Sequence, residues 1–208
     1  MGDQMKSTAE NKTVFGIGIN DSGYPVTVNS LINGRLKQLW VCPIYSAWKN
    51  MLERCFSQKF KTKRHTYAGC AVAPEWLTFS VFRTWALTQP WEGAQLDKDI
   101  LFKGNKAYGP EMCVFVPGQL NIFINDNSAA RGEWPIGVCW NKHHGKFQAS
   151  CSNPFTRKQQ HLGYFYDPNE AHEAWRKRKH EHACTYADMQ TDLRISAALR
   201  TRYAMVSI

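Results

Sequence analysis

Charged and amide side chains that could bind a metal ion occur in the segment between residues 96 and 121. Asp97, Lys98 and Asp99 are consecutive, and Asn121 follows further along the chain. Carboxylate and amide oxygens suit Mg²⁺ and Mn²⁺, and such an ion supports phosphodiester hydrolysis by activating water and stabilising developing charge. Asp97 and Asn121 are therefore candidate metal ligands. The alternative is a charged strand edge that holds a structural salt bridge.

Lys98 is the third candidate catalytic residue. A lysine acts as a general base only where burial or neighbouring cations lower its pKa by about 3 units. Its compact ammonium group is otherwise better suited to pairing with a phosphate. We therefore expect Lys98, if the site is catalytic, to support the phosphate that is cut.

The elements around these residues are predicted as two strands and a helix. Residues 96–101 and 110–116 favour strands, and a loop containing Gly104 and Asn105 joins them. A helix is expected to begin at Pro117, because proline is best tolerated at the first helical position, and Asn121 lies one turn inside it. This order is typical of a ββα metal-binding finger.

Two helices and a hairpin are predicted before this segment. Apolar residues recur at three- and four-residue steps across residues 45–55 and again across residues 76–87, which indicates two helices with one buried face each. Residues 14–19 and 24–28 are β-rich and flank a short Asn-Asp-Ser-Gly turn, so they predict a β-hairpin. Residues 1–12 are polar and are predicted to be disordered.

The second half predicts a small antiparallel sheet followed by helices. The polar residues 125–133 are the predicted linker. Three strands are expected over residues 136–140, 146–151 and 160–165. A helix capped by Asp167 follows to about residue 184, and a last helix covers residues 191–203.

The charge balance favours a polyanionic partner. The chain has 26 Lys and Arg against 17 Asp and Glu, a net charge of +9 and a pI near 9.3, which favours nucleic acid as the partner. The alternative is a basic protein that binds no polyanion. No apolar run approaches the roughly 20 residues that span a bilayer, so no membrane association and a cytoplasmic location are predicted. The basic segment with Lys61, Lys63 and Arg64 is either a contact to the phosphate backbone or a solvated turn.

The segment with Asp97 and Asn121 resembles the HNH endonucleases of phages and mobile introns. The resemblance implies that Asp97 binds the metal and that Asn121 is the helical ligand, while Lys98 stands at the general-base His and Met112 at the central Asn. An upstream Trp48-x-x-Met51-x-x-Arg54-Cys55 helix is similar to one in a phage family that often carries Lys or Arg at the His position. The resemblance implies a Mg²⁺- or Mn²⁺-dependent DNA endonuclease or nickase in the cytoplasm of a host cell.

Seven cysteines without a dense framework are expected to be reduced thiols or metal ligands. The same resemblance implies a structural Zn²⁺ site, because several ββα-metal nucleases hold a short core with four cysteines. The candidate ligands are Cys42, Cys55, Cys70 and Cys113, and the competing interpretation is buried, unligated thiols.

The second half resembles the AP2 DNA-binding domain, through a Gly137-Val138 pair, a Lys-Phe-x-Ala segment, a Leu-Gly-x-Phe segment and the helix that follows. The resemblance implies double-stranded DNA as the partner, with a three-stranded sheet in its major groove and a helix behind the sheet. The family places arginines that read bases at the positions that here hold Cys139, Asn141, Ser150 and Ser152. The candidate DNA-binding residues here, those that can read base edges and those that can clamp the backbone, are Asn141, Lys142, Lys146, Gln148, Ser150, Arg157 and Lys158.

The sequence therefore predicts an α+β protein with a tail and hairpin over residues 1–41, an HNH-like ββα-metal domain over residues 42–130 and an AP2-like domain over residues 131–208. Its predicted function is a divalent-metal-dependent DNA endonuclease or nickase. Two alternatives stay open: a non-catalytic DNA-binding or regulatory protein that retains the nuclease fold, and an interaction module for a host protein.

Overall fold

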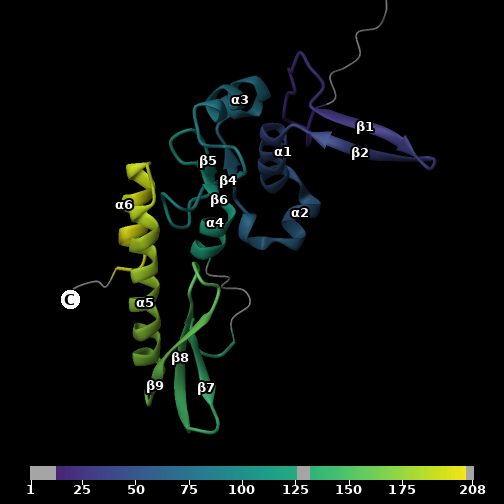
Figure 1. Cartoon of the computed structure of the whole chain (residues 1–208). Coiled ribbons are helices and arrows are strands. Elements are labelled where there is room, and N and C mark those ends of the chain that lie inside the picture. Colours follow the sequence, from purple (N-terminus) through teal and green to yellow (C-terminus); the bar gives the residue numbers. More distant parts are fainter. Residues whose placement is uncertain (1–12, 126–131, 205–208) are drawn as a thin grey trace, which may run out of the picture. The chain divides into compact units, whose positions relative to one another are not determined.

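The computed structural model of the chain describes residues 13–125 and 132–204. The protein is α+β, as the sequence predicts (Figure 1). The residues predicted as a disordered tail, 1–12, and most of the predicted linker, 126–131, lie outside the described residues. None of the helices in the described ranges is long and apolar enough to cross a membrane.

The chain divides into two compact units. The N-terminal unit comprises Met1–Lys98 and Asn105–Phe115, and the C-terminal unit comprises Asp99–Gly104 and Val116–Ile208. This division differs from the predicted borders at residues 41 and 130. The helix with Asn121 belongs to the C-terminal unit, where its neighbour Phe123 packs against Tyr186 at a ring distance of 5.0 Å.

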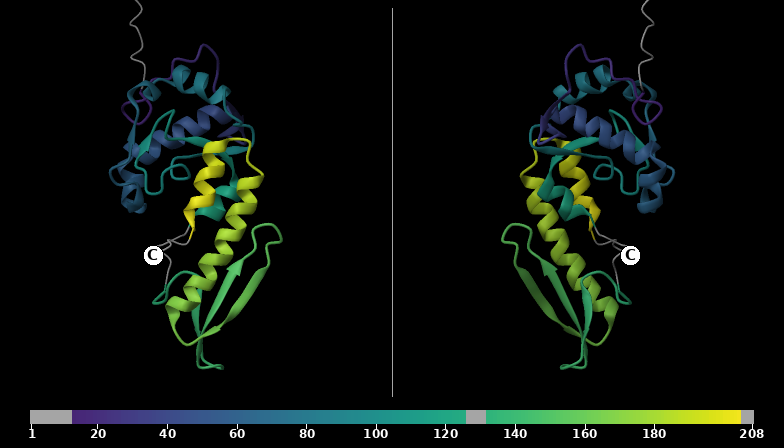
Figure 2. Two further views of the ribbon diagram at one scale, coloured as in Figure 1. Left: turned by 90° about the vertical axis from the view of Figure 1, so that its left-hand side faces the viewer. Right: turned by 90° about the vertical axis from the view of Figure 1, so that its right-hand side faces the viewer.

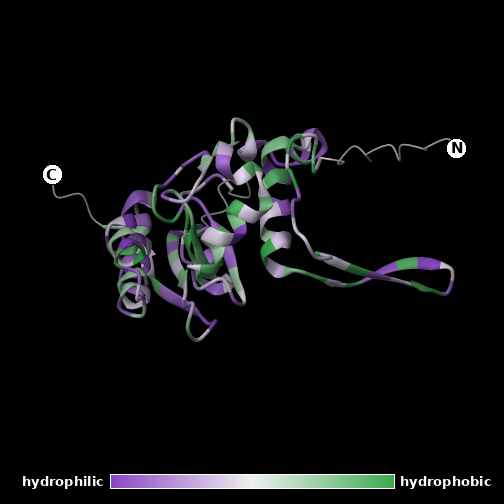
Figure 3. Cartoon of the chain, turned by 90° about the horizontal axis from the view of Figure 1, so that it is seen from above, coloured by the Kyte–Doolittle hydropathy of each residue, from purple (hydrophilic) through white to green (hydrophobic). Residues whose placement is uncertain are grey.

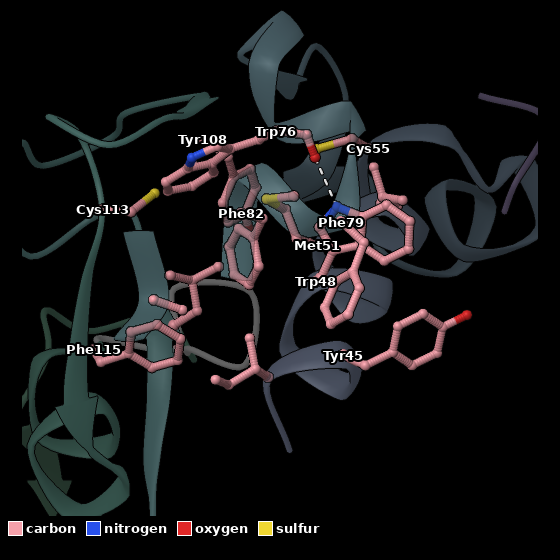
Figure 4. Close-up of a cluster of buried hydrophobic side chains, with 14 of the residues drawn as sticks. Tyr45, Trp48, Met51, Cys55, Trp76, Phe79, Phe82, Tyr108, Cys113 and Phe115 are labelled. Atoms are coloured by element: carbon pink, nitrogen blue, oxygen red, sulfur yellow. Dashed lines mark hydrogen bonds between the residues drawn. The ribbon is translucent and has the colours of Figure 1, made fainter. Parts of the chain in front are cut away.

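The N-terminal unit has an aromatic core built on two helices. Helix α1 (Pro43–Phe56) and helix α3 (Phe79–Leu87) confirm the two predicted helices, and their three- and four-residue apolar steps are buried. Trp48 and Trp76 are almost fully buried, and the Trp48 indole donates a hydrogen bond of 2.7 Å to the Trp76 carbonyl (Figure 4). Short segments complete the unit: α2 (Gln58–Lys63), η1 (His65–Tyr67), η2 (Pro74–Leu77), β3 (Ala71–Val72) and β5 (Ala107–Tyr108), the last two forming a parallel pair.

The predicted N-terminal hairpin is wrong in position. The hairpin consists of β1 (Thr27–Ile32) and β2 (Arg35–Val41), joined by Asn33 and Gly34. Both joining residues have positive φ, 52° and 72°, which is the conformation of the two-residue turn that suits the twist of antiparallel strands. The segment predicted as the turn instead caps α3, because Asp21 accepts a 2.8 Å hydrogen bond from the Ser80 backbone. The Ser80 hydroxyl, which donates to the same carboxylate, lowers the pKa of Asp21, and the backbone hydrogen bond acts in the same direction.

The predicted strand, strand and helix order around Asp97 is present. Strand β4 (Ala94–Asp97) pairs with β6 (Val114–Pro117), and α4 (Gly118–Ile124) follows directly after Pro117. The strand predicted over residues 96–101 is wrong in extent. β4 ends at Asp97, and a loop follows it. The basic segment with Lys61 and Lys63 is helical and is not a turn, because both residues lie in α2.

The C-terminal unit contains the predicted three-stranded sheet. Strands β7 (Val138–Asn141), β8 (Lys146–Ser152) and β9 (Gln159–Phe165) are antiparallel in that order. Helix α5 (Pro168–Asp188) begins after Asp167, whose carboxylate accepts hydrogen bonds from the first turn, and α6 (Leu193–Arg202) follows. Figure 2 shows α5 running along one face of the sheet.

Candidate nucleic-acid interface

Helix α5 covers only one face of the C-terminal sheet. On this inner face, Phe147 and Ala149 of β8 are buried and pack with Ala171 of α5. Close packing extends to the start of β7, where Gly137 has a φ of +82° and an added Cβ atom would lie 2.1 Å from Cδ1 of Trp175. Only glycine fits this approach, so α5 fixes which face of the sheet stays open.

The open face carries hydrogen-bonding side chains in paired rows. Along β8, buried residues alternate with half-buried Gln148 and Ser150, as expected for a strand with one covered face. The register places Gln148 opposite Cys139 and Tyr164, and it places Ser150 opposite His161. These neighbours share the open face because directly opposed residues of antiparallel strands point to the same side.

Side-chain hydrogen bonds order the far end of this face. The Gln159 amide nitrogen donates to the Ser150 hydroxyl at 2.8 Å, and the Ser152 hydroxyl donates to the Gln159 carbonyl oxygen at 2.6 Å. Gln159, His161 and Tyr164 were missed as candidates by sequence reasoning, whereas Ser152 was noted at a position where the AP2 family carries a base-reading arginine. The alternation along β8, extended across a three-stranded register, is the signal that would have found them.

Aromatic rings and one lysine occupy the other end of the open face. The Tyr164 ring lies 4.1 Å from His144 and 4.7 Å from His161, measured between centroids. The Lys146 ammonium group lies 4.3 Å from the centroid of Tyr166, within the range of a cation–π interaction. Such flat, partly exposed rings offer stacking surfaces, and the lysine places a positive charge beside them.

Asn141 shapes the turn between β7 and β8. Its side-chain oxygen accepts hydrogen bonds from the backbone N–H groups of His143 and His144, both at 3.1 Å. Its amide nitrogen donates to the side-chain oxygen of Gln148 at 2.9 Å. The predicted DNA-binding residue Asn141 thus builds the turn and orients Gln148, while Lys142 is exposed at the tip.

The turn between β8 and β9 presents two exposed cations. Asn153 organises it, because its side-chain oxygen accepts from the backbone of Phe155 and Thr156 at 2.9 and 3.0 Å. Arg157 occupies the left-handed region with a φ of 58°, which is unfavourable for a residue with a Cβ atom. Arg157 and Lys158 are both exposed, so this strained turn holds two positive charges at one end of the sheet.

The whole sheet segment lacks acidic residues. Between Glu133 and Asp167 the sequence contains no Asp or Glu, while it contains Lys142, Lys146 and the Arg157-Lys158 pair. A surface with cations and neutral hydrogen-bonding groups attracts polyanions without local repulsion. The open face therefore offers cations at its turns and neutral hydrogen-bonding groups at its centre.

The predicted basic contacts of the N-terminal unit lie on and beside α2. Lys61 is half-buried in this helix, Lys63 is exposed at its end, and Arg64 is the exposed C-cap. The helix therefore presents two exposed cations on adjacent residues. Charge alone does not distinguish a phosphate contact from a solvated helix end, so this contact stays a prediction.

Lys98 holds the base of a loop. Its side chain is only 6% exposed, and its ammonium group donates a 2.5 Å hydrogen bond to the Asn105 carbonyl. The Asn105 amide returns a hydrogen bond of 2.9 Å to the Lys98 carbonyl. The ammonium group also lies 5.9 Å from the ring centroids of Tyr67 and Tyr108. These contacts assign Lys98 a structural task at the point where the chain leaves and re-enters the N-terminal unit.

The two predicted metal ligands belong to different units. Asp97 is the last residue of β4 in the N-terminal unit and is half-buried. Asn121 lies in α4 in the C-terminal unit and is also half-buried. In the described part of the chain, no three His, Cys, Asp or Glu side chains converge as metal ligands.

The four cysteines predicted to bind zinc are all buried in the N-terminal unit, and none of them is in a disulfide. Burial raises the pKa of the Cys55 thiol to about 12, and the nearby Cys70 thiol acts in the same direction. A zinc ligand must be a thiolate, so a metal ion would have to overcome this desolvation. Zinc at Cys42, Cys55, Cys70 and Cys113 stays a prediction.

Comparison of the chain with protein-family models, with curated proteins and with solved structures found no match.

Proposed function

We propose that this protein binds double-stranded DNA with the open face of its β7–β8–β9 sheet. The observation that carries the proposal is the composition of that face, which combines cations at the turns, neutral hydrogen-bonding groups along the strands and no acidic residue from residue 134 to residue 166. Duplex DNA offers phosphates on both sides of a groove and donor and acceptor groups on its floor, which is the complementary arrangement.

The two kinds of side chain have different tasks in this proposal. Lys142, Arg157 and Lys158 sit on exposed turns, where flexible cations reach phosphates more readily than base edges. Gln148 and Ser150 lie at the centre of the face, where an amide and a hydroxyl can bond to bases. Affinity is thus expected from the turns and sequence preference from the strands.

The first test measures duplex binding by fluorescence anisotropy across a salt series. Wild-type affinity should fall roughly tenfold or more between about 50 and 200 mM salt, because each phosphate contact releases condensed counterions. The double variant Arg157→Ala/Lys158→Ala should bind every duplex more weakly and lower the salt slope by about 2. Gln148→Ala should change sequence preference more than affinity.

Lys177→Ala is the matched control, because Lys177 is an exposed lysine on α5, which covers the inner face of the sheet. Its loss should leave the salt slope close to that of the wild type. Binding that does not depend on salt, or a wild type that binds no duplex, would contradict the proposal. That result would favour the alternative of an interaction module for a host protein.

Metal-dependent cleavage of DNA is the second candidate function. It is supported by the strand, strand and helix order of β4, β6 and α4, with Asp97 at the end of the first strand and Asn121 inside the helix. A Mg²⁺ or Mn²⁺ ion held by Asp97 would stabilise the charge that develops on the phosphate. The burial and hydrogen bonding of Lys98 favour a structural role for it over a direct contact to the phosphate.

A plasmid-nicking assay with Mg²⁺ or Mn²⁺ tests this second function. If Asp97 is a ligand, wild type should relax the plasmid and Asp97→Asn should lose cleavage while it keeps duplex affinity. Glu111→Gln removes an exposed carboxylate of the same unit and should cleave like the wild type. Tight binding without cleavage by the wild type would leave the non-catalytic, regulatory alternative.

A further inference from the structure

The β1–β2 hairpin is a two-stranded ribbon that the described residues of its own unit leave uncovered. No residue of either strand is buried, and Leu31 and Leu36 near the turn are 70% and 72% exposed. Figure 3 shows apolar and polar residues interspersed along this ribbon. The ribbon joins the core only at its base, where Val26 is buried and its carbonyl accepts a 2.8 Å hydrogen bond from the Cys42 backbone.

An isolated two-stranded hairpin is marginally stable in water, so an uncovered one with large apolar side chains indicates a binding element. The chemistry of the ribbon then decides what it binds. From Ser22 to Leu52 the sequence contains no Asp or Glu, while Arg35 and Lys37 lie beside the turn. This charge complements a polyanion.

The strand register separates the ribbon into two faces. Leu31 is opposite Leu36 and Asn29 is opposite Gln38, so one face carries two leucines and two amides. Ile32 is opposite Arg35 and Ser30 is opposite Lys37, so the other face carries both cations. Apolar side chains thus occur on both faces.

This distribution distinguishes DNA from a protein partner. The core of a protein–protein interface is depleted of charged residues, whereas one face here carries two cations and the other carries two amides. The major groove of B-DNA, about 12 Å wide, admits a two-stranded ribbon and surrounds it with phosphates on two sides. Amides can bond to base edges there, and leucines can contact thymine methyl groups.

We propose that the β1–β2 hairpin is a second DNA-binding element that inserts into the major groove of the duplex, with the Leu31–Leu36 and Asn29–Gln38 pairs toward the bases and with Arg35 and Lys37 reaching the phosphates. This inference rests on the proposed DNA-binding function and adds a contact that lies in the other unit of the chain. Strands of six and seven residues reach roughly 20 Å at about 3.3 Å per residue, which is enough to follow a groove over several base pairs.

The test compares two hairpin variants of the full chain on the duplexes used above. Arg35→Ala/Lys37→Ala should weaken binding to every duplex by roughly tenfold and lower the salt slope by about 2. Leu31→Ser/Leu36→Ser should weaken binding by threefold or more and change the order of preference among duplexes. Leu193→Ser is the control for the loss of an exposed leucine, because Leu193 is 81% exposed on α6, and it should bind like the wild type.

Thermal unfolding and light scattering accompany these measurements. The hairpin variants should unfold at the wild-type temperature, since the replaced side chains are exposed, and all proteins should have the same molar mass. A wild type that binds DNA, together with hairpin variants of unchanged affinity and salt slope, would overturn this inference and leave the sheet proposal intact. A wild-type dimer that Leu31→Ser/Leu36→Ser dissociates would also overturn it and assign the ribbon to a second copy. A wild type that binds no duplex would overturn both proposals.

Discussion

The two antiparallel sheets without acidic residues differ in how they are supported. The β7–β8–β9 sheet has one face buried under α5, with Ala149 and Ala171 fully inaccessible, and its open face is ordered by side-chain hydrogen bonds. The β1–β2 hairpin has both faces exposed and is anchored only at its base. Similar local chemistry is therefore presented once on a sheet that a helix supports and once on a ribbon without such support.

This difference suggests different costs of binding. A preformed surface loses little conformational entropy when it meets DNA, whereas a marginally stable ribbon must be ordered at that moment. We expect the sheet to provide most of the affinity and the hairpin to respond most strongly to the presence of the duplex. Three predictions test this contrast.

The largest contrast is expected in amide hydrogen exchange of the free protein. Amides of β1 and β2 should exchange roughly a hundredfold or more faster than those of β8, because the hairpin opens locally while β8 opens only with its unit. Duplex DNA should slow exchange in the hairpin more than in the sheet. Equal protection of β1 and β8 without DNA would contradict the contrast.

A second prediction concerns the packing that makes the sheet rigid. Gly137→Ala should destabilise the protein by roughly 3 kcal/mol, because the new Cβ atom would meet Trp175 and the backbone is left-handed. Gly145→Ala has the same backbone strain but open space around it, and it should cost only about 1 kcal/mol. Chemical denaturation of both variants checks this difference, and equal losses would show that the Trp175 contact is unimportant.

The smallest expected effect is at Arg157. Arg157→Gly should raise the free energy of unfolding by about 1 kcal/mol, because glycine adopts the left-handed backbone without strain, and it should still weaken binding to DNA. Denaturation and anisotropy on the same sample separate the two effects. A variant that gains stability without losing affinity would remove Arg157 from the interface.

The sequence correctly predicted those helices and strands in which apolar residues recur at regular steps, because such a recurrence marks one buried face. The helix around Trp48 and the strand that alternates from Lys146 to Ser152 were found because each buries one face. The β1–β2 hairpin was missed because neither of its faces is buried, so its residues show no clean alternation. Its Asn33-Gly34 turn is a strong local signal and could have located it.

The candidate site depends on contacts between residues that are distant in sequence. Lys98 looked like a replaced catalytic base, and its burial follows from Tyr67, Asn105 and Tyr108, which no local pattern brings together. The division of the chain between Phe115 and Val116 likewise depends on packing such as that of Phe123 on Tyr186. The sequence identified only part of the open face of the C-terminal sheet. The residues that β9 contributes to this face follow from the pairing of β9 with β8, which the sequence alone does not fix.

The chain passes between its units three times, after Lys98, after Gly104 and after Phe115. No single cut therefore separates the units, because a break at residue 115 leaves residues 99–104 on the wrong fragment. Arg202 of α6 would then lose the Asp99 carbonyl, to which it donates a 3.0 Å hydrogen bond. Because the chain crosses between the units three times, one recombination event cannot exchange either unit between proteins.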